Sequence, residues 1–221
     1  MQYEDNCTPY AFLIQAFIFH SPVMQLSQDL SPLRAQFGNN KQIMQQHEHV
    51  ILEALSHYPE LTEIKIVFRP VKALIPLYTT VHPLTLFKRA GERIYIVHIA
   101  EKMKPGREDI MFKNLPVDIQ IGVVGHELSH VTDYLGKSGW QIIKTGLLYG
   151  IKSYKRRIEK RTDTSAIQHG FGAMLLRLSK RMEELKLHHP DDNYYQNYFD
   201  FYLSPNEITK ELQKINGEKN F

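Results

Sequence analysis

The chain has 221 residues, a length that suits one large domain or two small ones and allows a sizeable buried core. Apolar residues make up 43% and charged residues 23%, as in ordinary soluble globular proteins, and the net charge of +3 is too small to indicate a nucleic-acid partner. The single cysteine, Cys7, excludes an intrachain disulfide bond.

The first apolar run of the chain, Tyr10–Phe19, lacks the features of a secretory signal and of a membrane span. It follows Glu4 and Asp5, where a secretory signal would carry positive charge. Its length is about half of what crosses a bilayer. The single cysteine fits a reducing compartment. We therefore expect a soluble, cytoplasmic protein.

The next elements are short or helical. Residues 8–36 are expected to be irregular or short helical structure, because Ser-Pro pairs interrupt them. A helix is predicted from Asn39-Asn40 to about His57, where Tyr58-Pro59 ends it. Its apolar stripe consists of Ile43, Val50, Ile51, Ala54 and Leu55.

After Leu61 the apolar pattern changes to the alternation that is typical of strands. Strands are predicted at 62–68, 77–81 and 92–99, with a further short piece at 110–112. In the third strand, Ile94, Ile96 and His98 share one face and Tyr95, Val97 and Ile99 share the other.

The remainder of the chain, after Asn114, has the pattern of helices. They are predicted at 115–135, 140–154, 155–187 and 191–203, with a last helix that begins at the capping box Ser204-Pro205-Asn206-Glu207. Strands thus lie in an N-terminal part, about 1–113, and helices in a C-terminal part, about 114–221. This segregation predicts an α+β fold in a single domain, residues 1–221.

An HExxH motif, at residues 126–130, lies inside the predicted helix 115–135. Residues four apart in a helix lie about 6 Å apart on one face, so His126 and His130 can bind one metal ion. Glu127 can then reach a metal-bound water without binding the metal itself. We predict His126 and His130 as ligands of one Zn²⁺ per chain and Glu127 as the general base.

Two glycines precede the motif in the same helix. Gly122 and Gly125 each cost about 1 kcal/mol of helix propensity relative to alanine. Close packing against a neighbouring backbone would justify that cost, and we expect it here.

A catalytic zinc usually has three protein ligands and one open position. The spacing HExxHxxGxxH/D is excluded, because Asp133 and Gly136 occupy its last two defined positions. A second arrangement takes a glutamate from a later helix. The best candidate lies in the segment 157–163, which contains Glu159 and Asp163.

This combination of HExxH at 126–130 with Glu159-x-x-x-Asp163 resembles the gluzincin metallopeptidases, especially the HtpX-like and CAAX-prenyl-protease-like group. The resemblance covers about forty residues, 124–163. It implies a zincin-like fold with a small mixed sheet, hydrolysis of peptide bonds and a peptide or protein substrate. It also implies that Glu159 is the third ligand and that Asp163 holds a ligand histidine by its other ring nitrogen. Thr162 stands where that group usually has alanine, and the group's membrane spans are absent.

The residues by themselves leave alternatives open. Glu159 could be a solvated member of a basic helix face, or Asp163 could be the ligand in its place. Asp133 could orient a histidine or lie on the surface. His169, about 15 Å beyond Glu159 along a straight helix, could bind substrate, stabilise the oxyanion or be structural. The tyrosines that could polarise a substrate carbonyl are Tyr194, Tyr195, Tyr198 and Tyr202.

Substrate and partners follow from these predictions. A substrate peptide is expected to pair with an edge strand, for which Glu92–Ile99 is the candidate. The stretch Trp140–Ile151 is predicted to be a hairpin flap or an interface, with membrane-surface contact as the less favoured alternative.

The rival functions are a zinc-binding regulatory or scaffold protein without turnover, and a peripheral membrane or nucleic-acid protein that uses the basic region 152–161. We expect no nucleic-acid partner.

Overall fold

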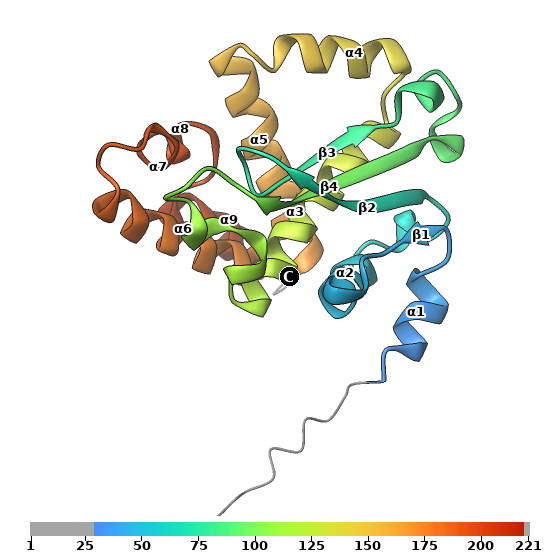
Figure 1. The fold of residues 1–221 in the computed structure, drawn as a ribbon, viewed down its shortest axis with the longest axis horizontal. Coiled ribbons are helices and arrows are strands. Elements are labelled where there is room, and N and C mark those ends of the chain that lie inside the picture. Colours follow the sequence, from blue (N-terminus) through green and yellow to red (C-terminus); the bar gives the residue numbers. More distant parts are fainter. Residues whose placement is uncertain (1–28, 219–221) are drawn as a thin grey trace, which may run out of the picture.

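The protein is described here by a computed structural model that covers residues 29–218 (Figure 1). Cys7, the apolar run Tyr10–Phe19 and the expectation for residues 8–28 lie outside the described residues. The strands cluster in the N-terminal half and the helices dominate the C-terminal half. The α+β class and the small mixed sheet predicted from the sequence are therefore confirmed.

Four strands form one mixed sheet, in the order β1-β2-β4-β3. They are β1 (Lys41–Gln42), β2 (Lys65–Lys72), β3 (Leu77–Val81) and β4 (Ile94–Lys102). β1, β2 and β4 run parallel, and β3 pairs antiparallel with β4. The sequence pattern predicted β3 with its observed bounds, and it placed β2 and β4 within a few residues.

The predicted substrate edge was wrong. Residues 92–99 belong mostly to β4, which lies between β2 and β3 and has no free edge. The antiparallel strand β3 is the outer strand on this side of the sheet. The almost continuous apolar run of β4 is the pattern of a strand that is buried on both faces, whereas strand order depends on packing between distant segments.

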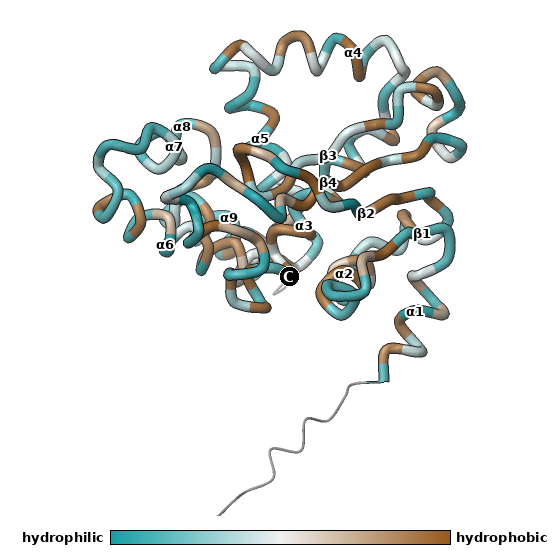
Figure 2. Tube along the Cα trace, viewed as in Figure 1, coloured by the Kyte–Doolittle hydropathy of each residue, from teal (hydrophilic) through white to brown (hydrophobic). Residues whose placement is uncertain are grey.

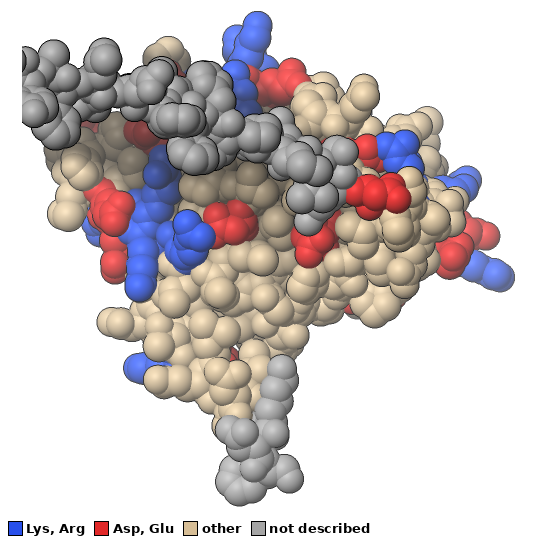
Figure 3. Space-filling view, turned by 90° about the horizontal axis from the view of Figure 1, so that it is seen from below, with Lys and Arg blue, Asp and Glu red and all other residues tan. Residues whose placement is uncertain are grey.

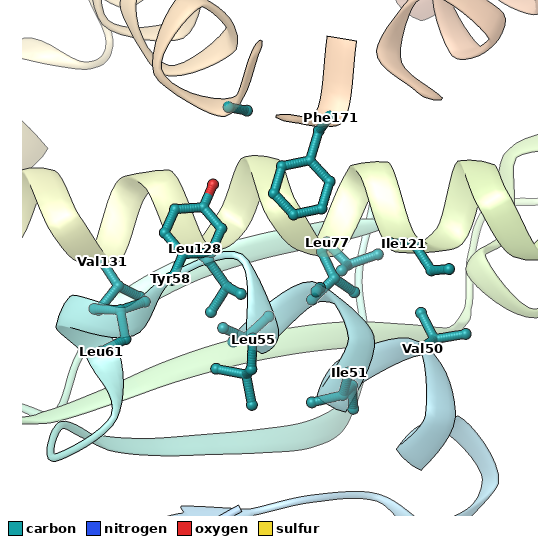
Figure 4. Close-up of a cluster of buried hydrophobic side chains, with 14 of the residues drawn as sticks. Val50, Ile51, Leu55, Tyr58, Leu61, Leu77, Ile121, Leu128, Val131 and Phe171 are labelled. Carbon is teal, nitrogen blue, oxygen red and sulfur yellow. The ribbon is translucent and has the colours of Figure 1, made fainter. Parts of the chain in front are cut away.

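Two helices cover one face of the sheet, α2 (Glu48–Ser56) and α3 (Val117–Leu135) (Figure 1). Leu128 and Val131 of α3 lie against Leu55 and Leu61, while Phe171 reaches the same helix from the other side (Figure 4). The core thus contains residues from both halves of the sequence.

The helix predicted from residue 39 begins later than expected. Asn40 has a positive φ of 60°, which asparagine tolerates better than most residues. The resulting turn places Lys41 and Gln42 in strand β1, so that Ile43 lies outside α2. The expected strand piece at 110–112 was also wrong, because short 3₁₀ turns occupy Glu108–Ile110 and Phe112–Asn114.

The C-terminal half consists of helices, and some of the breaks between them contain a glycine. They are α4 (Gly139–Leu148), α5 (Lys152–Ala166), α6 (Gly172–His188), α7 (Asn193–Gln196), α8 (Tyr198–Phe201) and α9 (Pro205–Glu218), and the short α1 (Ser31–Phe37) precedes the sheet. The single helix predicted at 155–187 is divided by a π-helical turn, Ile167–Phe171, in which Gly170 has a φ of 96°. The capping box before α9 is confirmed, since the Ser204 amide donates to Glu207 Oε2 and the Glu207 amide donates to Ser204 Oγ.

Within residues 29–218, no helix is both long enough and apolar enough to cross a membrane.

Candidate metal centre

Helix α3 carries His126, Glu127 and His130 at the centre of the molecule. All three are buried, with 6–8% of their surface exposed. The two imidazole ring centroids lie 5.0 Å apart, as the four-residue spacing predicts. Both rings turn away from the sheet core, towards the helix that crosses α3.

That helix is α5, which brings Glu159 to the two histidines. Glu159 Oε2 lies 3.2 Å from His126 Nε2 and 3.7 Å from His130 Nε2. The three potential ligand atoms all lie within 4.8 Å of one another. Ligands at zinc distances of about 2.1 Å in tetrahedral geometry are about 3.4 Å apart. The donor set could therefore hold one metal ion if the side chains moved slightly closer, and Glu159 is a buried member of the cluster with 1% exposure.

Each histidine also has a partner for its second ring nitrogen. His126 Nδ1 lies 2.8 Å from Asp163 Oδ1, and Asp163 Oδ2 accepts from the backbone amide of Leu203. His130 Nδ1 lies 3.3 Å from Thr162 Oγ1, whose hydroxyl donates to the carbonyl of Ile158. Both contacts favour the tautomer in which Nε2 is free to bind a metal.

The charges of the cluster are strongly coupled. Burial by itself lowers the pKa of His126, but the hydrogen bonds and charges of Asp163 and Glu159 outweigh it and raise that pKa well above its usual value. For Glu159 burial acts to raise the pKa, and the contacts with His126 and His130 reverse this and hold it well below its usual value. A cation at this position would take the place of the imidazole proton, so that metal binding and protonation compete.

Glu127 is held separately from the three-residue cluster. Its Oε2 accepts a 2.8 Å hydrogen bond from Thr79 Oγ1 of strand β3, and the same hydroxyl lies 3.2 Å from the Glu127 carbonyl. Glu127 and His126 line one pocket. The carboxylate is thus oriented by the sheet and faces the same space as the proposed ligand.

The rest of this pocket is mostly apolar and aromatic. Its lining includes Leu77, Leu115, Val123, Met182, Tyr194, Tyr198 and Tyr202. Tyr194, Tyr198 and Tyr202 were expected to be candidates for contact with a substrate carbonyl, and their place in this lining keeps them candidates. Tyr195 is fully buried in a neighbouring cluster and does not line the pocket.

The sequence did not single out Thr79 or Tyr149. Tyr149, at the end of α4, donates a hydrogen bond to Glu159 Oε1. Burial raises the Tyr149 pKa, and the nearby Glu159 charge raises it further, so this hydroxyl stays protonated. Neither residue belongs to a sequence motif. A tyrosine shortly before a candidate carboxylate ligand is too common a pattern to have identified Tyr149.

Two other sequence candidates have contacts elsewhere. His169 lies in the π-helical turn, where its ring contacts Glu60 Oε1 at 3.0 Å and stacks on Tyr58. It does not line the pocket that contains Glu127. Asp133 forms ion pairs with Lys137 and Arg161 rather than contacting a histidine of the cluster. Its pairing with Arg161 links the end of α3 to α5.

No protein-family model matches the chain, and neither a curated protein nor a solved structure resembles it significantly. What the protein does has to be inferred from the site itself.

Proposed function

We propose that the chain is a zinc-dependent metallopeptidase of the gluzincin type. The observation that carries this proposal is the position of Glu127, which lies outside the ligand cluster and is oriented by Thr79 into the pocket that His126 also lines. A purely structural zinc site has no use for a buried carboxylate in that position. His126, His130 and Glu159 would hold the ion.

The chemistry divides between the ion and the chain. Bound zinc supplies Lewis acidity, which lowers the pKa of a coordinated water towards about 7. Glu127 accepts the proton of the attacking water and passes it to the leaving amine. Asp163 and Thr162 hold the imidazoles in their ligand tautomer. Among the tyrosines that line the pocket, Tyr202 contacts the His126 ring and is the first candidate for a hydrogen bond to the substrate carbonyl.

The geometry of β3 supports a peptide as substrate. Pro76 and His82 exchange backbone hydrogen bonds with β4, through the Ala100 amide and the Ile94 carbonyl. In an antiparallel ladder the residues that alternate with these have backbone groups directed to the other side. The amides and carbonyls of residues 77, 79 and 81 are therefore directed to the outer edge, where an extended peptide can add as a further strand. Thr79 contacts Glu127, so this edge runs beside the proposed base.

The decisive variant is Glu127→Gln, which keeps the size and polarity of the side chain and removes the proton acceptor. We expect zinc content and circular dichroism to equal those of the wild type while hydrolysis falls by about 10²–10⁴-fold. Activity would be measured on a broad peptide library and on a denatured protein, at equal zinc occupancy.

Two results would argue against the proposal. Equal hydrolysis by wild type and variant would mean that Glu127 transfers no proton. Stoichiometric zinc without hydrolysis in either protein would favour the alternative, a zinc-binding regulatory or scaffold protein.

A further inference from the structure

Helix α4 presents apolar side chains to the outside of the molecule. It lies along one margin of the fold, above the sheet, and several of its residues are strongly hydrophobic (Figures 1 and 2). Trp140 is 72% exposed and Leu147 is 78% exposed. Seven residues make almost two helical turns, so these two side chains lie on the same face. The buried residue of α4 at mid-helix is the polar Thr145. Ile142, Ile143 and Leu148 are partly buried, so α4 leaves part of its apolar surface, at Trp140 and Leu147, facing outwards.

The loop between β3 and β4 extends this apolar face. Phe87 is 63% exposed and its ring contacts that of Trp140 edge-on, with centroids 5.2 Å apart. Leu84, in the same loop, is 87% exposed. Gly139 fits against the loop, because a Cβ there would lie 2.7 Å from the Leu86 carbonyl. Two segments that are far apart in the sequence therefore meet at Phe87 and Trp140. We call their exposed apolar side chains the α4 face: Leu84, Phe87, Trp140, Leu147 and Ile151.

The segments that build the α4 face are rich in positive charge. The stretches 64–91 and 134–158 contain five and six Lys or Arg residues respectively and no Asp or Glu. Lys88, Arg89, Lys144 and Lys152 are exposed, and none of them forms an ion pair within the described part of the chain. A hollow between α4 and α5 is lined by Lys137, Lys144 and Arg157 and by no carboxylate.

The opposite side of the molecule is different. Acidic and basic side chains are interspersed there (Figure 3). The segments that carry the exposed apolar side chains are thus also segments with an excess of positive charge. An apolar strip with a basic border matches the surface of an anionic bilayer, where apolar side chains enter the acyl boundary and cations meet the headgroups.

We propose that the α4 face docks the protein on anionic lipid membranes. Trp140 and Leu147 insert at the headgroup boundary, and Lys88, Lys144 and Lys152 contact lipid phosphates and carboxylates. This docking is independent of the metal centre and of any hydrolysis.

Trp140 itself reports on docking, because it is the only tryptophan of the chain. The full-length protein would be mixed with vesicles of phosphatidylcholine, with or without phosphatidylserine. We expect a blue shift of its emission, quenching by brominated acyl chains and flotation with the vesicles only when phosphatidylserine is present. High salt should weaken the binding, because it screens the cations.

Matched variants distinguish vesicle binding by the α4 face from nonspecific binding by any exposed apolar side chain. Leu147→Ser should weaken vesicle binding by at least about tenfold, and Lys144→Gln or Lys152→Gln by about fivefold each. Leu187→Ser is the control, because Leu187 is 81% exposed but lies on α6. All these positions are exposed, so the fold should be retained.

Three outcomes would overturn the proposal. The first is an unchanged Trp140 emission with anionic vesicles. The second is undiminished flotation of Leu147→Ser. The third is a blue shift that depends on protein concentration without vesicles, which would assign the α4 face to a second copy of the chain.

Discussion

Single side chains distinguish ligands from the residues that orient them. Glu159 Oε2 approaches both Nε2 atoms, whereas Asp163 contacts only the Nδ1 atom of His126 and the Leu203 amide. The sequence left open which of the two carboxylates binds the metal. Their contacts favour Glu159 and give Asp163 the role of holding an imidazole.

This assignment predicts the order of two substitutions. Asp163→Asn should weaken zinc binding by about 10–100-fold, the usual effect of losing a partner of a ligand histidine. Glu159→Ala should weaken it more, because it removes a ligand. Competition with a chromophoric chelator measures both affinities. The reverse order would make Asp163 the ligand and would exclude the glutamate class.

A second pair of substitutions tests the support of the proposed base. Thr79→Val removes the hydroxyl that binds Glu127 Oε2, and should lower kcat by about tenfold or more without changing zinc content. Thr80→Val is the matched control, since Thr80 lies on the same strand but contacts His98 on the opposite face. KM should change little in either variant. An equal loss of kcat in both would indicate a general effect on the sheet rather than on Glu127.

The sequence predicted part of this site because part of it is local. One helical turn is enough to predict His126, Glu127 and His130. One further segment is enough to predict Glu159 and Asp163. Thr79 could not be found in this way, because its contact with Glu127 depends on how β3 packs against α3. Nor could Tyr149, whose hydrogen bond depends on how the chain turns between α4 and α5.

At the scale of elements, glycines explain one expectation that was met in part and one that failed. Gly122 and Gly125 were expected to permit close packing against a neighbouring backbone. The packing is close, but a Cβ at either would meet side-chain atoms, of Met174 or Phe171, at 2.7 Å. The division between α5 and α6 at Gly170 was not expected, because one glycine in a helical pattern gives no sign of the positive φ that it adopts. Apolar periodicity predicts which face of a helix is buried better than it predicts where the helix is interrupted.

The packing at Gly125 can be tested by alanine. Gly125→Ala should gain up to about 1 kcal/mol of helix propensity. It should lose more through the clash with the Phe171 ring, since overpacking a core costs about 1–3 kcal/mol. We expect a net fall in Tm. Gly146→Ala in α4 meets no atom within 4 Å and should keep or raise the Tm. Thermal unfolding followed by circular dichroism compares them, and stabilisation by Gly125→Ala would contradict the packing argument.

The whole molecule is held together across its two halves. The main core contains Ile51 and Leu55 of α2 together with Phe171 and Ile208 from the C-terminal half. The proposed ligands add a connection inside the C-terminal half, because His126 and His130 belong to α3 and Glu159 to α5. A ligand bound only by the native state stabilises the entire fold, however local its contacts are.

Zinc should therefore raise the free energy of unfolding of the entire chain. Free zinc at about 1,000 times its Kd would contribute about 4 kcal/mol. For a domain of this size, that corresponds to a rise in Tm of about 8–16 °C. EDTA should reverse the rise. Scanning calorimetry on protein purified without a metal-affinity tag measures it.

Variants relate this response to the proposed roles. His126→Ala and His130→Ala should abolish the zinc-dependent rise, because each removes a ligand. Glu127→Gln should retain the rise in full, since Glu127 is proposed to transfer a proton and is not a member of the ligand cluster. Loss of the rise in Glu127→Gln would place Glu127 among the ligands, where it could no longer serve as a free base. A wild type that shows no rise with zinc, yet keeps its fold, would remove the metal centre and the proposed hydrolysis together, while leaving membrane docking by the α4 face to its own test.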